Sequence, residues 1–243
     1  EMINKKQIKE YEKKGFVVLK KFLSKIEIKN CSKSLEIYAK KYKPQKNRKI
    51  NFTKNNTVNS IHDLDKWIWT KNLRNKFKKK YFLDNIIGSK VKNFGSEYFA
   101  KPPKYGLESP PHQDNFYWCV NNDKGITVWI SLDKANKRNG GVYYFEGSHK
   151  LGLLNHKPSF APGSSQTVKS FKKLKNCKKT IPKLNPGDCI IHNSLVVHGS
   201  KKNNSNISRR GITIRFIPHG SKILNNKRNN YEKSLKKQIV ERL

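Results

Sequence analysis

Two segments alternate strictly between apolar and polar residues, and they constrain the fold more than any other feature of the sequence. Residues 126–133 place four aliphatic side chains on one face of a strand and Thr, Trp, Ser and Asp on the other. Residues 209–216 divide in the same way, with Ile212, Ile214 and Phe216 opposite Arg209, Gly211, Thr213 and Arg215. Strands of this kind fit a barrel or sandwich with helices on its outer side. We therefore expect a polar ligand site in the interior of a β-fold.

Helical patterns come before the strands. Residues 4–14 have helical spacing, Gly15–Leu19 is strand-like, and Ser24 with Glu27 forms a capping box that starts a second helix. Further helical turns are expected at residues 73–81 and 83–87. From residue 91 onward, short strand-like runs are separated by Gly, Pro and Asn. Helices followed by many short strands predict a mainly β fold with flanking helices, a helix-decorated jelly roll.

The domain organisation predicted from this pattern is simple. We find no internal repeat and no linker that would divide the chain, so we expect a single domain over residues 1–243. Its parts are a helical N-terminal region (1–90), a jelly-roll core (91–218) and a basic C-terminal tail (219–243). The Asn- and Lys-rich stretch 43–60, like residues 155–180, is expected to form loops.

The tripeptide His112-Gln113-Asp114 suggests a metal site. Residues i and i+2 of an extended segment project to the same side, so an imidazole and a carboxylate can bind one ion together. Downstream, residues 186–200 contain a strand that ends near His198. A third ligand from that strand would complete a set of two histidines and one carboxylate with three open positions, which suits non-haem Fe(II) oxygen chemistry.

Composition bears on partners and compartment. Lys and Arg number 53 against 17 Asp and Glu, a formal charge of +36. Such a charge suggests nucleic-acid binding, but the lysines are spread over the chain with abundant Asn and Ile, which share A/T-rich codons, so codon composition is an alternative explanation. The four cysteines are scattered and form no CxxC pair, which favours reduced thiols in the cytoplasm. No apolar run is long enough to span a bilayer, so we expect no membrane segment.

The order and spacing of several short motifs resemble the phytanoyl-CoA dioxygenase family of Fe(II)- and 2-oxoglutarate-dependent oxygenases. The resemblance covers most of the chain. The motifs are Gly15-Phe16-Val17-Val18, Lys101-Pro102-Pro103, His112-Gln113-Asp114, Thr127-Val128-Trp129-Ile130-Ser131-Leu132-Asp133, Asn139-Gly140-Gly141, Gly147-Ser148-His149-Lys150, Pro186-Gly187-Asp188, His198-Gly199-Ser200 and Arg209.

This resemblance implies a double-stranded β-helix (jelly roll, cupin-like) that binds Fe(II), 2-oxoglutarate and O2, and hydroxylates an aliphatic C–H of a small molecule with release of succinate and CO2. The positive charge favours an anionic substrate. A nucleic-acid-binding protein on an oxygenase scaffold without turnover is the alternative. The residues that the resemblance assigns are iron ligands His112, Asp114 and His198, the carboxylate-binding Arg209, and cofactor-lining Gln113, Trp129 and Ser200.

Strand parity separates Arg209 from its neighbour Arg210, because adjacent residues point to opposite faces and only one can enter the pocket. Arg215 shares the parity of Arg209 but lies six residues along the strand, roughly 20 Å away, and should not reach the same carboxylate. For His192, two interpretations are open: support of the metal site, or an ordinary core histidine, which is the more common fate. For residues 232–243 the alternatives are a solvated terminal helix and a basic amphipathic segment that touches a membrane or a partner.

Overall fold

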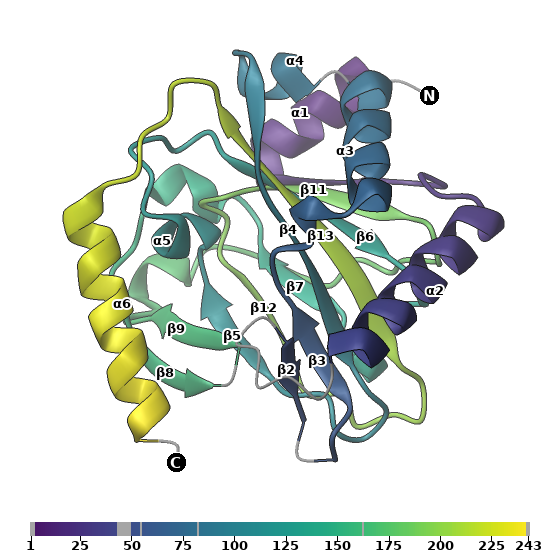
Figure 1. Ribbon diagram of the computed structural model, residues 1–243. Coiled ribbons are helices and arrows are strands. Elements are labelled where there is room, and N and C mark those ends of the chain that lie inside the picture. The colour runs from purple at the N-terminus through teal and green to yellow at the C-terminus, as the bar shows by residue number, and fades with distance from the viewer. Residues whose placement is uncertain (1–2, 43–49, 54, 82, 162, 242–243) are drawn as a thin grey trace.

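Two antiparallel sheets face each other, with helices on the outer side of the larger one (Figure 1). The computed structural model describes residues 3–42, 50–53, 55–81, 83–161 and 163–241. The helices are α1 (Lys5–Lys14), α2 (Lys25–Tyr42), α3 (Ile68–Tyr81), α4 (Leu83–Ile87), α5 (Asp114–Trp118) and α6 (Asn225–Val240).

The larger sheet has seven strands and the smaller one four. In order across the larger sheet, the strands are β1 (Phe16–Leu19), β11 (Cys189–Asn193), β6 (Ile126–Ser131), β13 (Arg209–Pro218), β4 (Val91–Lys101), β3 (Val58–Ile61) and β2 (Ile50–Phe52). The smaller sheet runs β10 (Lys179–Thr180), β7 (Val142–Phe145), β12 (His198–Ser200) and β5 (Ser109–His112), and a separate hairpin joins β8 (His156–Ala161) to β9 (Ser164–Val168). The jelly-roll prediction is confirmed.

The alternation has the predicted consequence within β6 and β13, but Asp133, which it places on the polar face, follows the end of β6 and pairs with Arg210 instead. The aliphatic residues of β6 and β13 pack in one core with the helices that cover the larger sheet, and Figure 1 shows α2 and α3 lying over that face. The polar face of both strands therefore points the other way, into the space between the two sheets. The members of this outer core include Ile126, Val128 and Ile130 of β6, Ile212, Ile214 and Phe216 of β13, and Leu35, Leu73 and Phe77 of the helices.

A second, smaller core closes the space between the sheets at one end. Phe16 of β1 stacks on Tyr144 of β7 with ring centroids 4.4 Å apart, and Trp129 and Ile190 pack in the same cluster. Because this cluster joins strands of both sheets, it fixes their separation. The remaining interior is available to the polar residues described below.

The N-terminal elements follow the predicted pattern. The capping box at the start of α2 is present: the Ser24 amide donates to the Glu27 carboxylate at 2.8 Å, and the Glu27 amide donates to the Ser24 hydroxyl at 3.3 Å. Residues 1–90 also supply three strands, β1, β2 and β3, to the larger sheet, so this region is part of the sandwich.

Both stretches predicted as loops contain strands, and that prediction is wrong for much of their length. Within 43–60, β2 and most of β3 form a hairpin that extends the larger sheet, whereas residues 43–49 and 54 lie outside the described residues. Within 155–180, β8 pairs with β9 and β10 pairs with β7. β8 and β9 are mostly polar, and β2, β3 and β10 are only two to four residues long, so their sequences give little of the apolar alternation that identifies a half-buried strand.

The C-terminal helix α6 packs against the β8–β9 hairpin through polar contacts. Gln166 donates to the Ser234 hydroxyl at 3.2 Å, and the Phe160 amide donates to Gln238 at 3.1 Å. Of the two alternatives for this region, the solvated terminal helix is only half right, because one side of α6 is attached to the domain. Of the helices in the described part of the chain, none is long and apolar enough to cross a bilayer.

Candidate active site

The structure brings the three predicted metal ligands together from two strands and the start of a helix. His112 ends β5 and His198 begins β12, and the two are register partners in the smaller sheet. Asp114 is the first residue of α5, and its Oδ1 lies 3.7 Å from Nε2 of His112 and 3.6 Å from Nε2 of His198. One ligand atom from each residue lies within 4.8 Å of the others.

Backbone carbonyls fix the orientation of both imidazoles. Nδ1 of His112 lies 2.7 Å from the Pro110 carbonyl, and Nδ1 of His198 lies 3.0 Å from the Val196 carbonyl. A carbonyl only accepts hydrogen bonds, so each Nδ1 carries the proton and each Nε2 presents a lone pair. Burial, followed by the nearby His198 ring, lowers the pKa of His112 to about 4, and burial lowers the pKa of His198 to about 4. Both rings are therefore neutral at pH 7, the form that binds metals.

The Asp114 carboxylate is held by one oxygen and free at the other. Oδ2 accepts from the Thr127 hydroxyl at 2.5 Å and from Nε2 of His192 at 3.0 Å. Burial would raise the pKa of Asp114, but the surrounding imidazoles and the hydrogen bond from His192 outweigh it and hold the pKa below its usual range. Oδ1 and the two imidazole Nε2 atoms thus converge with no donor between them. Three converging acceptors fit a cation, and the donor set of two histidines and a carboxylate fits a divalent transition metal.

His192 contacts Asp114, which favours support of the metal site over the alternative of an ordinary core histidine. It lies on β11, is 2% exposed, and bridges the Tyr144 hydroxyl (3.0 Å) and the Asp114 carboxylate (3.0 Å). Strand parity predicts that His192 faces the interior. It shares a face of β11 with Ile190 of the inner core, whereas Cys189 and Ile191 belong to the outer core. Thr127, on the polar face of β6, was recognised as interior but not as a partner of Asp114.

Replacing His192 with phenylalanine is expected to weaken divalent-metal binding by about 10- to 100-fold, the usual cost of losing a partner behind a metal ligand. The ring volume is kept, but the hydrogen bond that orients the Asp114 carboxylate is lost. Calorimetric titration with Mn(II) measures the effect. Tyr144→Phe, which removes only the hydroxyl on the far side of His192, should cost less than tenfold. An unchanged metal affinity in His192→Phe would show that this residue only fills the core.

Arg209 is buried without a carboxylate partner among the described residues. The residue is 4% exposed, and its Nε has no hydrogen-bond partner within the described part of the chain. Its guanidinium carbon lies 5.3 Å from the centre of the Trp129 ring. Burial lowers its pKa to about 10, so it remains charged at neutral pH. A buried cation that lacks a counter-ion fits an anionic ligand.

The neighbouring arginines of β13 behave differently, as strand parity predicts. Arg210 points to the opposite face and forms a two-pronged pair with Asp133, with Nε at 2.9 Å and Nη2 at 2.8 Å. Arg215 lies six residues along the strand and its Nη2 is 3.5 Å from the Glu97 carboxylate.

Lys101 places a second basic side chain beside Arg209, and the sequence suggests no role for it beyond its place in a motif. The two residues are register partners on β4 and β13, and Lys101 is 3% exposed. Burial first, and then the adjacent Arg209, hold the pKa of Lys101 well below its ordinary value. Both residues line the same recess, together with Glu108 and Ser109 of the segment that leads to His112. The recess therefore holds the buried guanidinium of Arg209 next to the Lys101 amine.

The three residues predicted to line the cofactor have different fates. Trp129 lies beside Arg209, and Gly211 makes room for it, since a Cβ at Gly211 would lie 2.3 Å from the indole. Ser200 is buried two residues after His198, on the same face of β12. The side chain of Gln113, however, donates to the Gly152 and Leu195 carbonyls and accepts from the Leu154 amide. These hydrogen bonds connect the segment between His112 and Asp114 to the loops that contain Gly152 and Leu195. The Gln113 side chain therefore points away from the cluster of His112, Asp114 and His198.

Comparison with known proteins identifies what this architecture is similar to. Residues 11–211 match the family model described as phytanoyl-CoA dioxygenase (PhyH). The mouse phytanoyl-CoA dioxygenase domain-containing protein 1 is 29% identical over 127 residues, which are 50% of this chain and 43% of that protein. The bovine peroxisomal phytanoyl-CoA dioxygenase is 25% identical over 232 residues, 88% of this chain and 68% of that protein. The chain thus spans less than half the length of the mouse relative.

Solved structures with the same fold are more distant in sequence. EctD from S. alaskensis, solved with bound Fe, superposes with a TM-score of 0.74 at 18% identity and covers 89% of this chain and 77% of its own. SnoK, a non-heme alpha ketoglutarate dependent carbocyclase of nogalamycin biosynthesis, has a TM-score of 0.72 at 18% identity, covering 91% of this chain and 86% of its own. At these identities the likeness establishes the fold alone.

Proposed function

The chain belongs to the phytanoyl-CoA dioxygenase family, and from this membership and the geometry of the site we propose that it is an Fe(II)- and 2-oxoglutarate-dependent oxygenase that hydroxylates a small molecule. The observation that carries the proposal is the chemistry of the polar interior: His112, Asp114 and His198 present three converging acceptor atoms, and the Nε of the buried Arg209 has no hydrogen-bond partner among the described residues.

In this proposal His112, Asp114 and His198 hold Fe(II). The two carbonyl-bound Nδ1–H groups keep both Nε2 lone pairs aimed at the ion, and Thr127 and His192 hold the second oxygen of Asp114 away from it. A bound ferrous ion with 2-oxoglutarate and O2 supplies the oxidation of a C–H bond, with succinate and CO2 as products. The residues of the chain hold the ligand lone pairs in place, orient the co-substrate and keep the interior dry.

Arg209 binds the far carboxylate of 2-oxoglutarate, with Lys101 lying beside it and Trp129 forming a wall. The planar fork of a guanidinium matches a carboxylate, and burial makes the pairing stronger than it would be in water. The buried Ser200, on the His198 strand, is also part of this co-substrate site.

The carboxylate at position 114 favours hydroxylation over halogenation. Where a small residue stands at this position, a halide can occupy the vacant coordination site, and here Asp114 fills it. Desaturation and ring closure are the other outcomes that such a centre supports, and product analysis distinguishes them.

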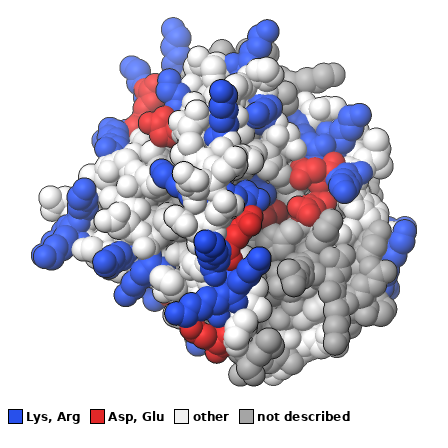
Figure 2. All heavy atoms as spheres, turned by 60° about the vertical axis from the view of Figure 1, so that its left-hand side comes forward, with Lys and Arg blue, Asp and Glu red and all other residues white. Residues whose placement is uncertain are grey.

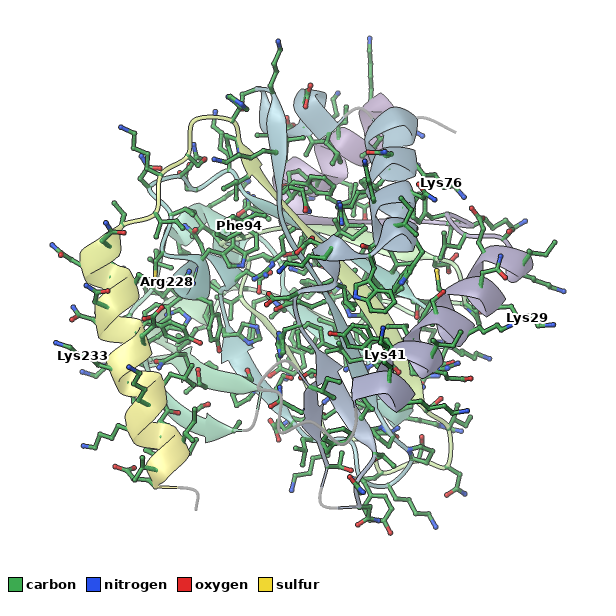
Figure 3. The ribbon with its side chains drawn as sticks, viewed as in Figure 1. Lys29, Lys41, Lys76, Phe94, Arg228 and Lys233 are labelled. Atoms are coloured by element: carbon green, nitrogen blue, oxygen red, sulfur yellow. The ribbon has the colours of Figure 1, made fainter. Side chains whose placement is uncertain are left out.

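An anionic small molecule is the substrate class that we propose, because a basic protein concentrates anions at its surface. Figure 2 shows Lys and Arg side chains dispersed over one face, with Asp and Glu among them, and Figure 3 shows Lys29 and Lys233 directed away from the body of the protein. This dispersal does not favour the nucleic-acid alternative, which calls for a clustered stripe or patch. For comparison, the Stutzerimonas stutzeri relative that is 27% identical over 140 residues, 55% of this chain and 48% of that protein, is named as a probable hypophosphite dioxygenase.

Anaerobic titration of the metal-free protein with Fe(II) and then 2-oxoglutarate tests the proposal. We expect a visible absorption band that requires both additions and saturates at one equivalent of each. On admission of O2, succinate should form from 2-oxoglutarate. Steeply salt-dependent retention on DNA or RNA, with no response to 2-oxoglutarate, would favour the nucleic-acid alternative instead.

A further inference from the structure

A second charged cluster lies in the interior, at the other end of β13 from Arg209. It consists of His62, which follows β3, Glu97 of β4 and Arg215 of β13. The His62 Nδ1 lies 2.7 Å from the Glu97 carboxylate, and the Arg215 Nη2 lies 3.5 Å from it. Burial would raise the pKa of Glu97, but Arg215 and then His62 outweigh it and lower the pKa, so the carboxylate is ionised.

The backbone of β4 is shaped to receive the Arg215 side chain. The register between β13 and β4 shifts between Arg215 and Phe216, and Gly95 has a φ of +146°, where L side chains are rare. A Cβ at Gly95 would lie 2.3 Å from Nη2 of Arg215, so the guanidinium occupies the space that a side chain would fill. Its carbon lies 5.7 Å from the Phe94 ring centre and 6.0 Å from that of Trp118. Figure 3 shows Phe94 on the α5 side of β4.

This cluster adjoins the proposed metal site. Arg215 is the register partner of Thr127, whose hydroxyl donates to Asp114, and Trp118 lies on α5, which begins at Asp114. The side chains of Arg215 and Asp114 are both partly open to solvent, with 22% and 17% of their surface exposed. A molecule from solvent can therefore reach Arg215 beside the proposed metal ligands.

The guanidinium of Arg215 makes fewer and longer polar contacts than that of Arg210, which belongs to a structural ion pair. Arg210, five residues earlier, holds Asp133 with two short hydrogen bonds. Arg215 instead makes one long contact, and its buried Nε has no hydrogen-bond partner in the described residues. The short bond of Glu97 goes to His62, so the guanidinium is the loosely held member of the cluster.

We propose that Arg215 is the substrate-recognition residue of this site and that its guanidinium binds an oxyanion of the substrate, a carboxylate or a phosphoryl group. Glu97 and His62 position the guanidinium and limit the site to a ligand of low negative charge. The inference rests on the proposed function, since it takes the reacting centre to be at Asp114. It attributes the preference for an anionic substrate to one residue, Arg215, and not to the positive charge of the whole surface.

The arginine Nε–H NMR signals of the full chain test this directly, with inorganic phosphate and acetate as probes, each added at constant ionic strength against chloride. Signals are assigned with Arg209→Lys and Arg215→Lys. We expect a saturable shift of the Arg215 signal with one or both probes, and the tighter probe identifies the oxyanion class. Arg215→Gln should weaken that binding by about 10- to 100-fold, the range for hydrogen bonds to a charged group.

Two further variants make the test decisive. Arg210→Gln, the matched control on the same strand, should leave the affinity within twofold. Glu97→Gln, which removes the competing negative charge at nearly constant shape, should tighten phosphate binding by roughly threefold or more. If Arg215→Gln does not fold, the Glu97→Gln result and the Arg215 shift still decide. An Arg215 signal that does not saturate, or equal losses in Arg215→Gln and Arg210→Gln, would overturn the proposal.

The experiment also separates this inference from the proposed function. Repeating the titrations with Zn(II) and 2-oxoglutarate present should change the Arg209 signal and leave the Arg215 response to phosphate or acetate in place. An Arg209 signal that ignores 2-oxoglutarate counts against the oxygenase proposal, whereas an Arg215 signal that ignores both probes counts against the recognition residue.

Discussion

Replacing Arg209 with alanine is expected to weaken 2-oxoglutarate binding by roughly 100- to 1000-fold, since loss of one member of a buried hydrogen-bonded charge pair costs about 2–5 kcal/mol or more. The co-substrate would bury its far carboxylate against Lys101 alone, whose own pKa is depressed by burial. The anaerobic titration with Fe(II) and 2-oxoglutarate measures the change. Fe(II) binding itself should be unaffected, because Arg209 is not among the metal-binding residues.

Arg210→Ala is the matched control for this prediction. It removes the same side chain one position along β13, but from the opposite face, where Asp133 keeps hydrogen bonds from the Ser208 hydroxyl and the residue 210 amide. We expect a change in 2-oxoglutarate affinity of less than about threefold, as for surface charges that do not meet the ligand. Greater damage in Arg210→Ala than in Arg209→Ala would mean that the carboxylate binds elsewhere.

Arg209→Ala should also be at least as thermally stable as the natural protein when both are free of ligands. A buried cation without a counter-ion is a cost to the folded state, and its removal relieves that cost at the expense of function. Thermal unfolding of the two proteins, with and without 2-oxoglutarate, checks this. Stabilisation by 2-oxoglutarate should be seen only where Arg209 is present.

The sequence was most informative where a residue's face is decided by its own strand. The alternation in β6 and β13 predicts which residues line the interior, and the parity argument separates Arg209 from Arg210 without any knowledge of partners. The two histidines and the aspartate were likewise predictable, because an i, i+2 pair and a strand-end histidine are local features. The structure brings these ligand atoms together.

Prediction failed where a role depends on contacts from other strands. His192 is a histidine on a buried strand in either interpretation, and only Tyr144 and Asp114, from distant parts of the chain, give it a function. Gln113 lies between two ligands, yet its extended backbone sends its side chain to the opposite side, toward Gly152 and Leu195. The β2–β3 hairpin is short and the β8–β9 hairpin is mostly polar, so pairing and packing rather than periodicity define them.

Replacing Asp114 with asparagine is expected to weaken Fe(II) binding by more than about a thousandfold, well beyond the 10- to 100-fold cost of losing an outer partner, while the protein stays folded. The oxygen that accepts from Thr127 and His192 can be supplied by the amide carbonyl. The amide NH2 then points between the imidazoles of His112 and His198, where it donates to the Nε2 lone pairs that the metal requires. The variant thus fills the cation site with its own donor, and the ligand-free protein should be no less stable than the natural one.

Asp133→Asn, at a carboxylate paired with Arg210 outside the interior, is the control and should bind metal normally. Calorimetric titration with Fe(II) or Mn(II), together with thermal unfolding, measures both quantities; metal binding within tenfold of the natural protein in Asp114→Asn would show that the three acceptors do not form the iron site.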